Sequence, residues 1–220
     1  MAQKKLENLW QKGRKQMLND VTVFNIREYL SAKGDKDLGE DELRQLLSEF
    51  FCDKNPDVER FLKEQSIEFT KKNQSVTYLV FSNEDASLVG YFTITIKPIT
   101  VNAENFSNTM KRKIARVSEL DEENGTYTLS AYLIAQLGKN FKDGANEKIT
   151  GEQLLHAAVD TIKELQYMAG GMVIFLEAED KEKLMHFYQE ENGFKQFDIR
   201  EMKCRDEDEI HKLVQLLKVM

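Results

Sequence analysis

The sequence predicts a mixed α/β fold of the α+β kind, in which a mostly antiparallel central sheet is flanked by helices and preceded by a helical N-terminal extension. Three observations support this prediction. The first third of the chain repeats apolar residues at helical spacing. Two strand-like runs, residues 76–82 and 87–96, then flank a turn signal. Finally, a helical pattern at residues 148–165 stands between two further strand-like runs.

The N-terminal third contains four predicted helical segments. Residues 1–19 fit an amphipathic helix, and residues 21–33 fit a second helix or helical turn. Residues 41–52 show the i, i+3, i+4, i+7, i+8 pattern of a core-facing helix. Asn55 and Pro56 then form a cap and a first-turn proline, which open a helix that reaches Phe69. The apolar side chains of the first three segments are Leu6, Leu9, Trp10, Met17, Phe24, Tyr29, Leu30, Leu43, Leu46, Leu47, Phe50 and Phe51.

A β-hairpin and an insertion follow. Residues 76–82 and 87–96 are joined by the turn sequence NEDA, which predicts an antiparallel pair. Pro98 ends or edges the second strand, because proline has no N–H to donate. Residues 101–125 form an insertion with a short helix that is closed by the loop DEENG.

The central stretch is a strand, a long loop and a helix. Residues 126–138 are rich in Thr, Tyr, Leu and Ile, which favour a strand. Residues 148–165 then form a helix, for which Thr150 is the predicted N-cap and Gln153 completes a capping box. One apolar stripe runs along this helix through Leu154, Leu155, Ala158, Val159, Ile162 and Leu165.

The remaining elements continue the alternation. Residues 172–178 are an apolar run of strand length, and a second helix carrying Leu184, Phe187 and Tyr188 ends at Asn192 and Gly193. Residues 193–204 predict a strand, and residues 211–220 fit a last strand or a helix. This order indicates an antiparallel meander followed by a crossover helix that joins two parallel strands. We divide the chain into an extension, residues 1–54, and a domain, residues 55–220, which form one compact unit.

Composition limits the function classes. The chain has 220 residues, a net charge of −7 and 41% hydrophobic residues, as expected for a globular protein. No run approaches the roughly 18 apolar residues of a membrane span, and the N-terminus lacks the apolar core of a signal peptide. We therefore expect a cytoplasmic protein without a membrane partner, and the negative charge argues against nonspecific nucleic-acid binding. A homodimer is compatible with the sequence.

The cysteines and histidines do not predict a metal site. Cys52 and Cys204 lie far apart, and the three histidines, His156, His186 and His211, are scattered. We expect reduced thiols that serve as small packing residues, and no structural metal.

The loop between residues 138 and 151 is suited to an anion. A strand that leads through a loop to a helix N-terminus offers free backbone N–H groups and the positive end of a dipole. Gly138, Gly144 and Gly151 allow a close approach of the backbone, and Lys148 adds a positive charge. A capping box also starts many helices that bind nothing.

Residues 55 to about 203 resemble the GNAT superfamily of acyl-CoA-dependent N-acyltransferases. The resemblance rests on the strand YLIAQLG, the helix start ITGEQLL and the later FYQEENGFKQF, in the order of that family. It implies acetyl-CoA as the cosubstrate and direct transfer of the acetyl group to a primary amine of an acceptor. A small metabolite, an antibiotic, a peptide N-terminus or a protein lysine would all fit as acceptor.

The resemblance also implies roles for particular residues. Ala135, Gln136 and Leu137 would line the pantetheine arm, and their backbone N–H groups would hold the developing oxyanion. The pyrophosphate would lie against Lys148, Ile149, Thr150 and Gly151. Tyr188 would be the general acid, since a phenol with a pKa of about 10 is protonated at neutral pH and can give its proton to the departing thiolate. Phe187 and Tyr188 could instead only fill the groove between helix and sheet.

Several alternatives stay open. Glu177 and Glu179 are candidate general bases or surface carboxylates. The basic cluster at residues 111–116 suggests an acetyltransferase that acts on aminoacyl-tRNA, or a solvated helix face balanced by the acidic residues at 119–123. Of the family's phosphate motif, only Gly151 matches in residues 146–151, which motivates a third possibility, a noncatalytic acyl-CoA-binding or interaction module.

Overall fold

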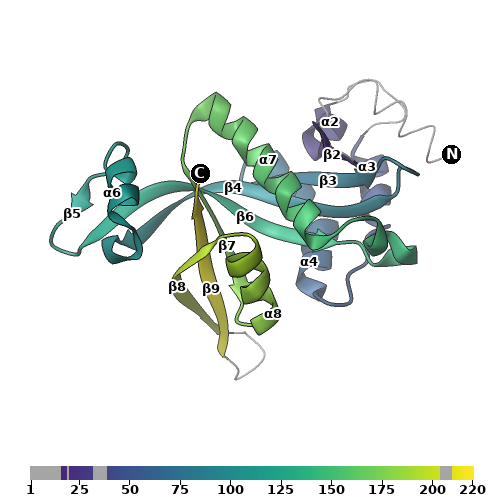
Figure 1. The fold of residues 1–220 in the computed structure, drawn as a ribbon. Coiled ribbons are helices and arrows are strands. Elements are labelled where there is room, and N and C mark those ends of the chain that lie inside the picture. Colours follow the sequence, from purple (N-terminus) through teal and green to yellow (C-terminus); the bar gives the residue numbers. More distant parts are fainter. Residues whose placement is uncertain (1–15, 19, 32–38, 204–209) are drawn as a thin grey trace. The chain divides into compact units, whose positions relative to one another are not determined.

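The computed structural model describes residues 16–18, 20–31, 39–203 and 210–220, and Figure 1 shows their elements. These residues belong to two compact units, one made of Met1–Thr95 and Ala135–Glu164 and the other of Ile96–Ile134 and Leu165–Met220. Three elements run from one unit into the other: β4 (Leu88–Asn102), β6 (Thr126–Lys139) and α7 (Gly151–Ala169). Each unit is built around its own part of the two long strands.

In the first unit the strands follow the order β1-β2-β3-β4-β6. The first three are β1 (Gln16–Leu18), β2 (Val21–Asn25) and β3 (Val76–Ser82), and all pairs from β1 to β4 are antiparallel. The predicted hairpin of β3 and β4 is therefore confirmed, with Val76 paired to Ile94 at its far end.

Of the two helical segments predicted before residue 33, the described residues confirm only the second half of the second one. Gln16–Leu18 is a strand, and residues 1–15 of that predicted helix lie outside the described part. Val21–Asn25 is also a strand, and only α2 (Ile26–Ser31) is helical. The β-branched side chains of Val21, Thr22 and Val23 are buried in register with β3, and this pairing outweighs the helical spacing of the apolar residues.

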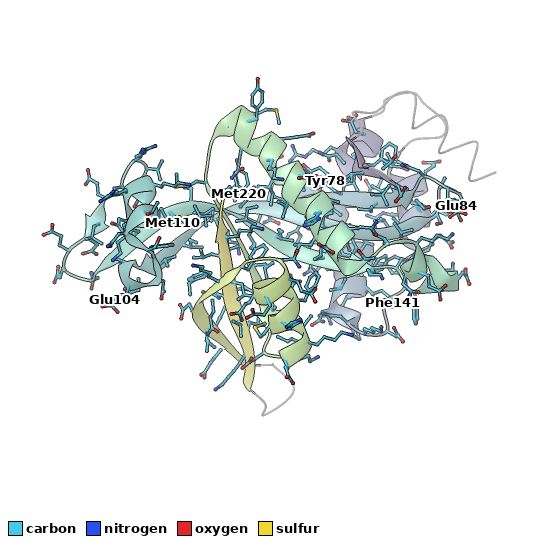
Figure 2. All side chains as sticks on the ribbon, in the orientation of Figure 1. Tyr78, Glu84, Glu104, Met110, Phe141 and Met220 are labelled. Atoms are coloured by element: carbon cyan, nitrogen blue, oxygen red, sulfur yellow. The ribbon has the colours of Figure 1, made fainter. Side chains whose placement is uncertain are left out.

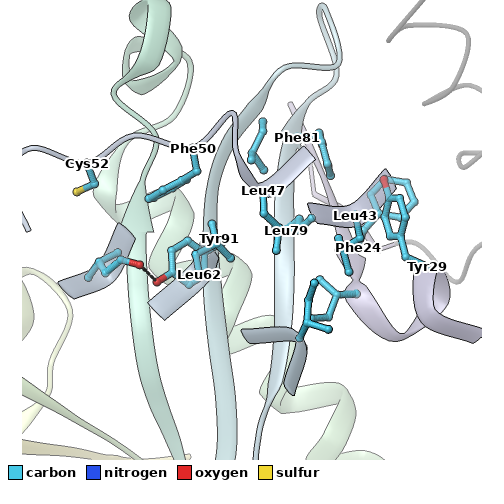
Figure 3. Packing of buried hydrophobic residues seen from close by; sticks show 14 of the residues in the cluster. Phe24, Tyr29, Leu43, Leu47, Phe50, Cys52, Leu62, Leu79, Phe81 and Tyr91 are labelled. Carbon is cyan, nitrogen blue, oxygen red and sulfur yellow. Dashed lines mark hydrogen bonds between the residues drawn. The ribbon is translucent and has the colours of Figure 1, made fainter. Parts of the chain in front are cut away.

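A short helical layer connects β2 to β3. It consists of α2, α3 (Glu40–Leu47), α4 (Pro56–Arg60), the π-helical segment η1 (Phe61–Gln65) and α5 (Ser66–Lys71). The predicted cap is confirmed, because the Asn55 side chain accepts a hydrogen bond of 3.3 Å from the amide of Val58. Figure 3 shows the apolar cluster that these helices form with the sheet, in which Leu43, Leu47, Phe50 and Leu62 are fully buried.

Helices cover both faces of the first sheet. Tyr91 points toward the helical layer, where its hydroxyl donates a 2.6 Å hydrogen bond to the carbonyl of Val58 and its ring meets Phe50 edge to face (Figure 3). Gly90, the preceding strand residue, faces the opposite side. A Cβ at Gly90 would lie 3.1 Å from Leu154 of α7, so α7 packs on that side. Residues of α7 that follow in its apolar stripe, such as Leu155 and Ala158, are buried.

In the second unit the strands follow the order β4-β6-β7-β9-β8, and β5 (Leu120–Asp121) pairs with β6. β6 and β7 (Val173–Glu179) are parallel, as predicted for strands joined by the crossover helix α7. The other strands are β8 (Lys195–Lys203) and β9 (Ile210–Val219), and both pairs that β9 makes are antiparallel. The predicted fold class, a mixed and mostly antiparallel sheet flanked by helices, is confirmed.

The structure shows what happens at Pro98 and at the C-terminal segment, for both of which the sequence left two possibilities. Pro98 does not end β4, which continues to Asn102. The pairing of β4 with β3 ends at Ile94, so Pro98 lies where β4 no longer has β3 as a neighbour, and proline is tolerated at such an edge. The C-terminal segment is the strand β9, inserted between β7 and β8. None of the described helices is both long enough and apolar enough to span a membrane.

Candidate functional site

The start of α7 offers two unused backbone donors. The predicted capping box is present: the amide of Thr150 donates to Gln153 Oε1 at 2.8 Å, and the amide of Gln153 donates to Thr150 Oγ1 at 3.0 Å. The next two amides, those of Gly151 and Glu152, have no acceptor within the described part of the chain. They lie at the positive end of a 19-residue helix, where an anion is stabilised.

The loop before α7 has its own short helical segment and two buried apolar residues. It contains the 3₁₀ segment η3 (Lys142–Lys148), where Asp143 and Gly144 have positive φ angles of 49° and 77°. Ala145 is buried, and Ile149 is only 2% exposed. Of the predicted phosphate-loop residues, Ile149 can therefore meet a ligand only through its backbone.

Lys148 does not present a free charge. Its ammonium group donates a hydrogen bond to Asp85 Oδ2 and a second one, of 3.2 Å, to Ser87 Oγ. Asp85 also accepts from the amide and the hydroxyl of Ser87, at 3.2 and 2.8 Å. The hydrogen bond from Lys148 is the main reason why the pKa of Asp85 falls to about 2. Lys148 thus ties the end of the loop to the β3–β4 turn.

The other end of the loop is fixed by Asn140, which is 3% exposed. Its Oδ1 accepts from the amides of Phe51 and Lys142, at 2.9 and 3.1 Å. Its Nδ2 donates to the carbonyls of Leu88 and Glu49, at 2.8 and 3.2 Å. No sequence pattern predicts this role for Asn140, because an asparagine after a strand carries no signal for contacts so distant in the chain.

Ala135, Gln136 and Leu137 lie in β6 immediately after its pairing with β7 ends. That pairing has four residue pairs, from Ala131 with Val173 to Ile134 with Leu176. Ala135 is exposed, and Gln136 and Leu137 are half-buried. The strand β6 has β4 on one side and β7 on the other, and the three residues lie beyond the part that pairs with β7. The backbone N–H and C=O groups that they direct to the β7 side therefore have no partner from β7.

Tyr188 belongs to the second unit, whereas the seven predicted cofactor-binding residues all belong to the first. It lies in the π-helical segment η4 (His186–Glu191), which follows α8 (Glu182–Met185) and ends before Gly193 with φ of 68°. Its ring packs edge to face on Phe187 and Phe194, with centroids 4.9 and 6.0 Å apart. The hydroxyl has no hydrogen-bond partner among the described residues. Burial raises the pKa of Tyr188 to about 12.

Both candidate bases, Glu177 and Glu179, interact with neighbouring side chains. Glu177 accepts a 2.7 Å hydrogen bond from Gln215 Nε2 and lies 3.4 Å from Arg200 NH1. Glu179 forms an ion pair with Lys181. The geometry of the second unit therefore singles out neither carboxylate as a base.

The basic cluster lies on α6 (Asn108–Ile114) and just beyond it. Its members are Lys111, Arg112, Lys113 and Arg116, and none forms an ion pair within the described residues. Figure 2 shows the side chains of this region around Met110. None of the acidic residues at 119–123 forms a direct ion pair with the cluster in the described part of the chain, and Asp121 accepts from the amides of Glu123 and Asn124. The four cations of this cluster therefore have no direct carboxylate partner among the described residues.

Cysteine and histidine side chains add no further site where they are described. Cys52 is buried, and burial raises the pKa of its thiol. Cys204 and the side chain of His211 lie outside the described residues. In the described ranges, no group of three or more His, Cys, Asp and Glu side chains could hold a metal ion.

Comparison with known proteins gives a likeness of fold. No family model matches the chain, and no curated protein matches it in sequence. Among solved structures, AtaT complexed with acetyl-methionyl-tRNAfMet matches with a TM-score of 0.56 and 16% identity, over 89% of this chain and 94% of that chain. A tyrosine-to-phenylalanine variant of the toxin KacT matches with a TM-score of 0.56 and 16% identity, over 91% and 95%. A similar variant of AtaT, bound to the C-terminus of the antitoxin AtaR and acetyl-CoA, has a TM-score of 0.52 and 16% identity, over 91% and 94%.

Proposed function

We propose that this protein is an N-acetyltransferase that moves an acetyl group from acetyl-CoA to a primary amine. The observation that carries the proposal is the start of α7, where the free amides of Gly151 and Glu152 form an anion site directly after a strand and loop. The fold likeness to AtaT, which has been solved with acetyl-CoA, supports acetyl-CoA as the ligand.

In this proposal the first unit binds the cosubstrate. The pyrophosphate takes the backbone N–H groups of Gly151 and Glu152. The capping box of Thr150 and Gln153 satisfies the amides on either side of these two. Lys148, through its ion pair with Asp85, and the buried Ile149 hold the loop in place. The backbone groups of Ala135, Gln136 and Leu137 that have no partner from β7 accept the pantetheine arm, as an added strand would bind.

The chemistry is direct transfer. The amine nitrogen attacks the thioester carbon, and the developing oxyanion is stabilised by backbone N–H groups of β6. The carbon–sulfur bond then breaks, and the thiolate takes the phenol proton of Tyr188. The attacking nitrogen loses one proton to water, and the phenolate takes one proton back from water, which restores the enzyme. The hydroxyl of Tyr188 has no acceptor among the described residues, which supports this role, and the phenol is protonated over the whole neutral range.

Titration calorimetry with acetyl-CoA tests the proposal first, with desulfo-CoA alongside to ask whether the nucleotide and pantetheine portions suffice. Micromolar binding of both, followed by CoA release in the presence of an amine, is the expected result. Binding without release for any amine would favour a noncatalytic acyl-CoA-binding module. No binding up to millimolar concentration would remove the cosubstrate and the proposal together.

A second candidate narrows the acceptor to the amino group of an aminoacyl-tRNA. Two observations favour it: AtaT has been solved with acetyl-methionyl-tRNAfMet, and the cations of α6 have no carboxylate partner in the described residues. Such binding would weaken steeply with salt, since each phosphate contact releases counterions. Charge reversal of Lys111 and Arg112 should lower activity on aminoacyl-tRNA and spare activity on a small amine; unchanged activity on aminoacyl-tRNA would refute a role for this cluster.

A further inference from the structure

Two lysines near the end of β6 lack a carboxylate partner. In the same region of the first unit, Lys142 forms an ion pair with Glu49, and Lys148 forms one with Asp85. Lys54 and Lys139 form no ion pair and no side-chain hydrogen bond within the described ranges. Of these four lysines, Lys54 and Lys139 are therefore the two whose charge is not paired with a carboxylate.

The fold brings the two lysines to one place, although 85 positions separate them in the sequence. The amide of Phe141 donates a 2.7 Å hydrogen bond to the carbonyl of Phe51, and the amide of Phe51 donates to Asn140. Lys54 lies shortly after Phe51, with its Nζ 4.4 Å from the centroid of the Phe141 ring. Lys139 directly precedes Asn140. Figure 2 labels Phe141, which marks the junction.

The electrostatics of this junction favour an anion. Burial lowers the pKa of Lys139, and the like charge of Lys54 lowers it further. Burial and a nearby like charge both disfavour the protonated form of a lysine. A negative group bound between the two lysines would favour it again. The ring of Phe141 holds Lys54 in position but supplies only a weak cation–π contact. A doubly charged phosphate would relieve both effects.

We propose that Lys54 and Lys139 form a second phosphate-binding site in the first unit, separate from the amides at the start of α7. The inference rests on the proposed function, because it assigns this site to the 3′-phosphate of acyl-CoA and leaves the pyrophosphate to α7. The 3′-phosphate is a terminal group with two negative charges, which matches two lysines better than a bridging diester does.

The test compares CoA with 3′-dephospho-CoA by titration calorimetry. The wild type should bind CoA about three- to tenfold more tightly, as expected for a largely exposed lysine pair. The double variant K54Q/K139Q should lose this preference while binding 3′-dephospho-CoA like the wild type. Glutamine keeps most of each aliphatic stem, so folding is preserved, and thermal unfolding checks this. If K54Q/K139Q unfolds, the exposed single variant K54Q should show a reduced preference by itself.

The control variant is K63Q/K72Q, which removes the same charge from lysines that are paired with Glu59 and Glu68. It should keep the full preference for CoA. Equal affinity of the wild type for CoA and 3′-dephospho-CoA would overturn the second site and leave the proposed function standing. If K54Q/K139Q still preferred CoA over 3′-dephospho-CoA, the second site would likewise be overturned and the proposed function would stand. If neither ligand bound to the wild type, the proposed function itself would be overturned.

Discussion

The amide of Phe51 donates a 2.9 Å hydrogen bond to Asn140 Oδ1, so the chain before α4 is joined to the residue that follows β6. Replacing Asn140 by alanine should destabilise the protein by about 2–4 kcal/mol, because it leaves the amides of Phe51 and Lys142 without their acceptor. Denaturant unfolding measures the change. Asn124→Ala, at an exposed turn, is the control and should cost less than about 1 kcal/mol. Equal losses for the two variants would show that Asn140 does not anchor the loop.

Gly138 allows the helical layer to approach β6. A Cβ at this position would overlap Val58 Cγ1 and would lie 3.4 Å from the rings of Phe50 and Tyr91. Gly138→Ala should therefore destabilise the protein by about 1–3 kcal/mol. In a Val58→Ala background, where the overlapping methyl is gone, the same change should cost clearly less. A double-mutant cycle by denaturant unfolding measures this coupling, and a coupling energy of zero would contradict the close approach.

Tyr188→Phe separates catalysis from folding. The hydroxyl has no hydrogen-bond partner in the described part of the chain, so its removal should leave the melting temperature unchanged. Turnover of acetyl-CoA should fall by about 10²-fold or more, with binding retained, because the thiolate loses its proton donor. Tyr91→Phe is the matched control: it removes the hydroxyl that donates to Val58, and should lower stability by about 1 kcal/mol. Wild-type turnover in Tyr188→Phe would exclude the acid role.

The ion pair of Lys148 with Asp85 should make stability depend on pH in the acid range. Lys148 lowers the pKa of Asp85 to about 2, below the value of about 3.9 for an unfolded aspartate. The stabilisation is therefore complete above pH 4 or so and is lost as the pH falls toward 2. Melting temperatures of the wild type and Lys148→Met, measured from pH 6 to pH 2, should converge at the acid end. The difference should be modest, because Asp85 is 43% exposed. Parallel curves would contradict the coupling.

Local signals predicted much of the fold. The capping box of Thr150 and Gln153, the cap at Asn55, the turn between β3 and β4 and the apolar stripe of α7 each depend on residues a few positions apart. Such patterns act on the backbone directly, so the sequence contains them in full. The order of these elements was then enough to predict a crossover between parallel strands.

What the sequence by itself determined is this succession of helices, strands and caps, together with the strand, loop and helix start that suggest an anion site. Only the tertiary structure decided the rest. Val21–Asn25 is a strand because it pairs with β3. The C-terminal segment is likewise a strand because it pairs with β7 on one side and β8 on the other. Lys148 is bound to Asp85, while Lys54 and Lys139 are left without a carboxylate. Pairing and charge balance depend on groups brought together from distant parts of the chain, and no local pattern records them.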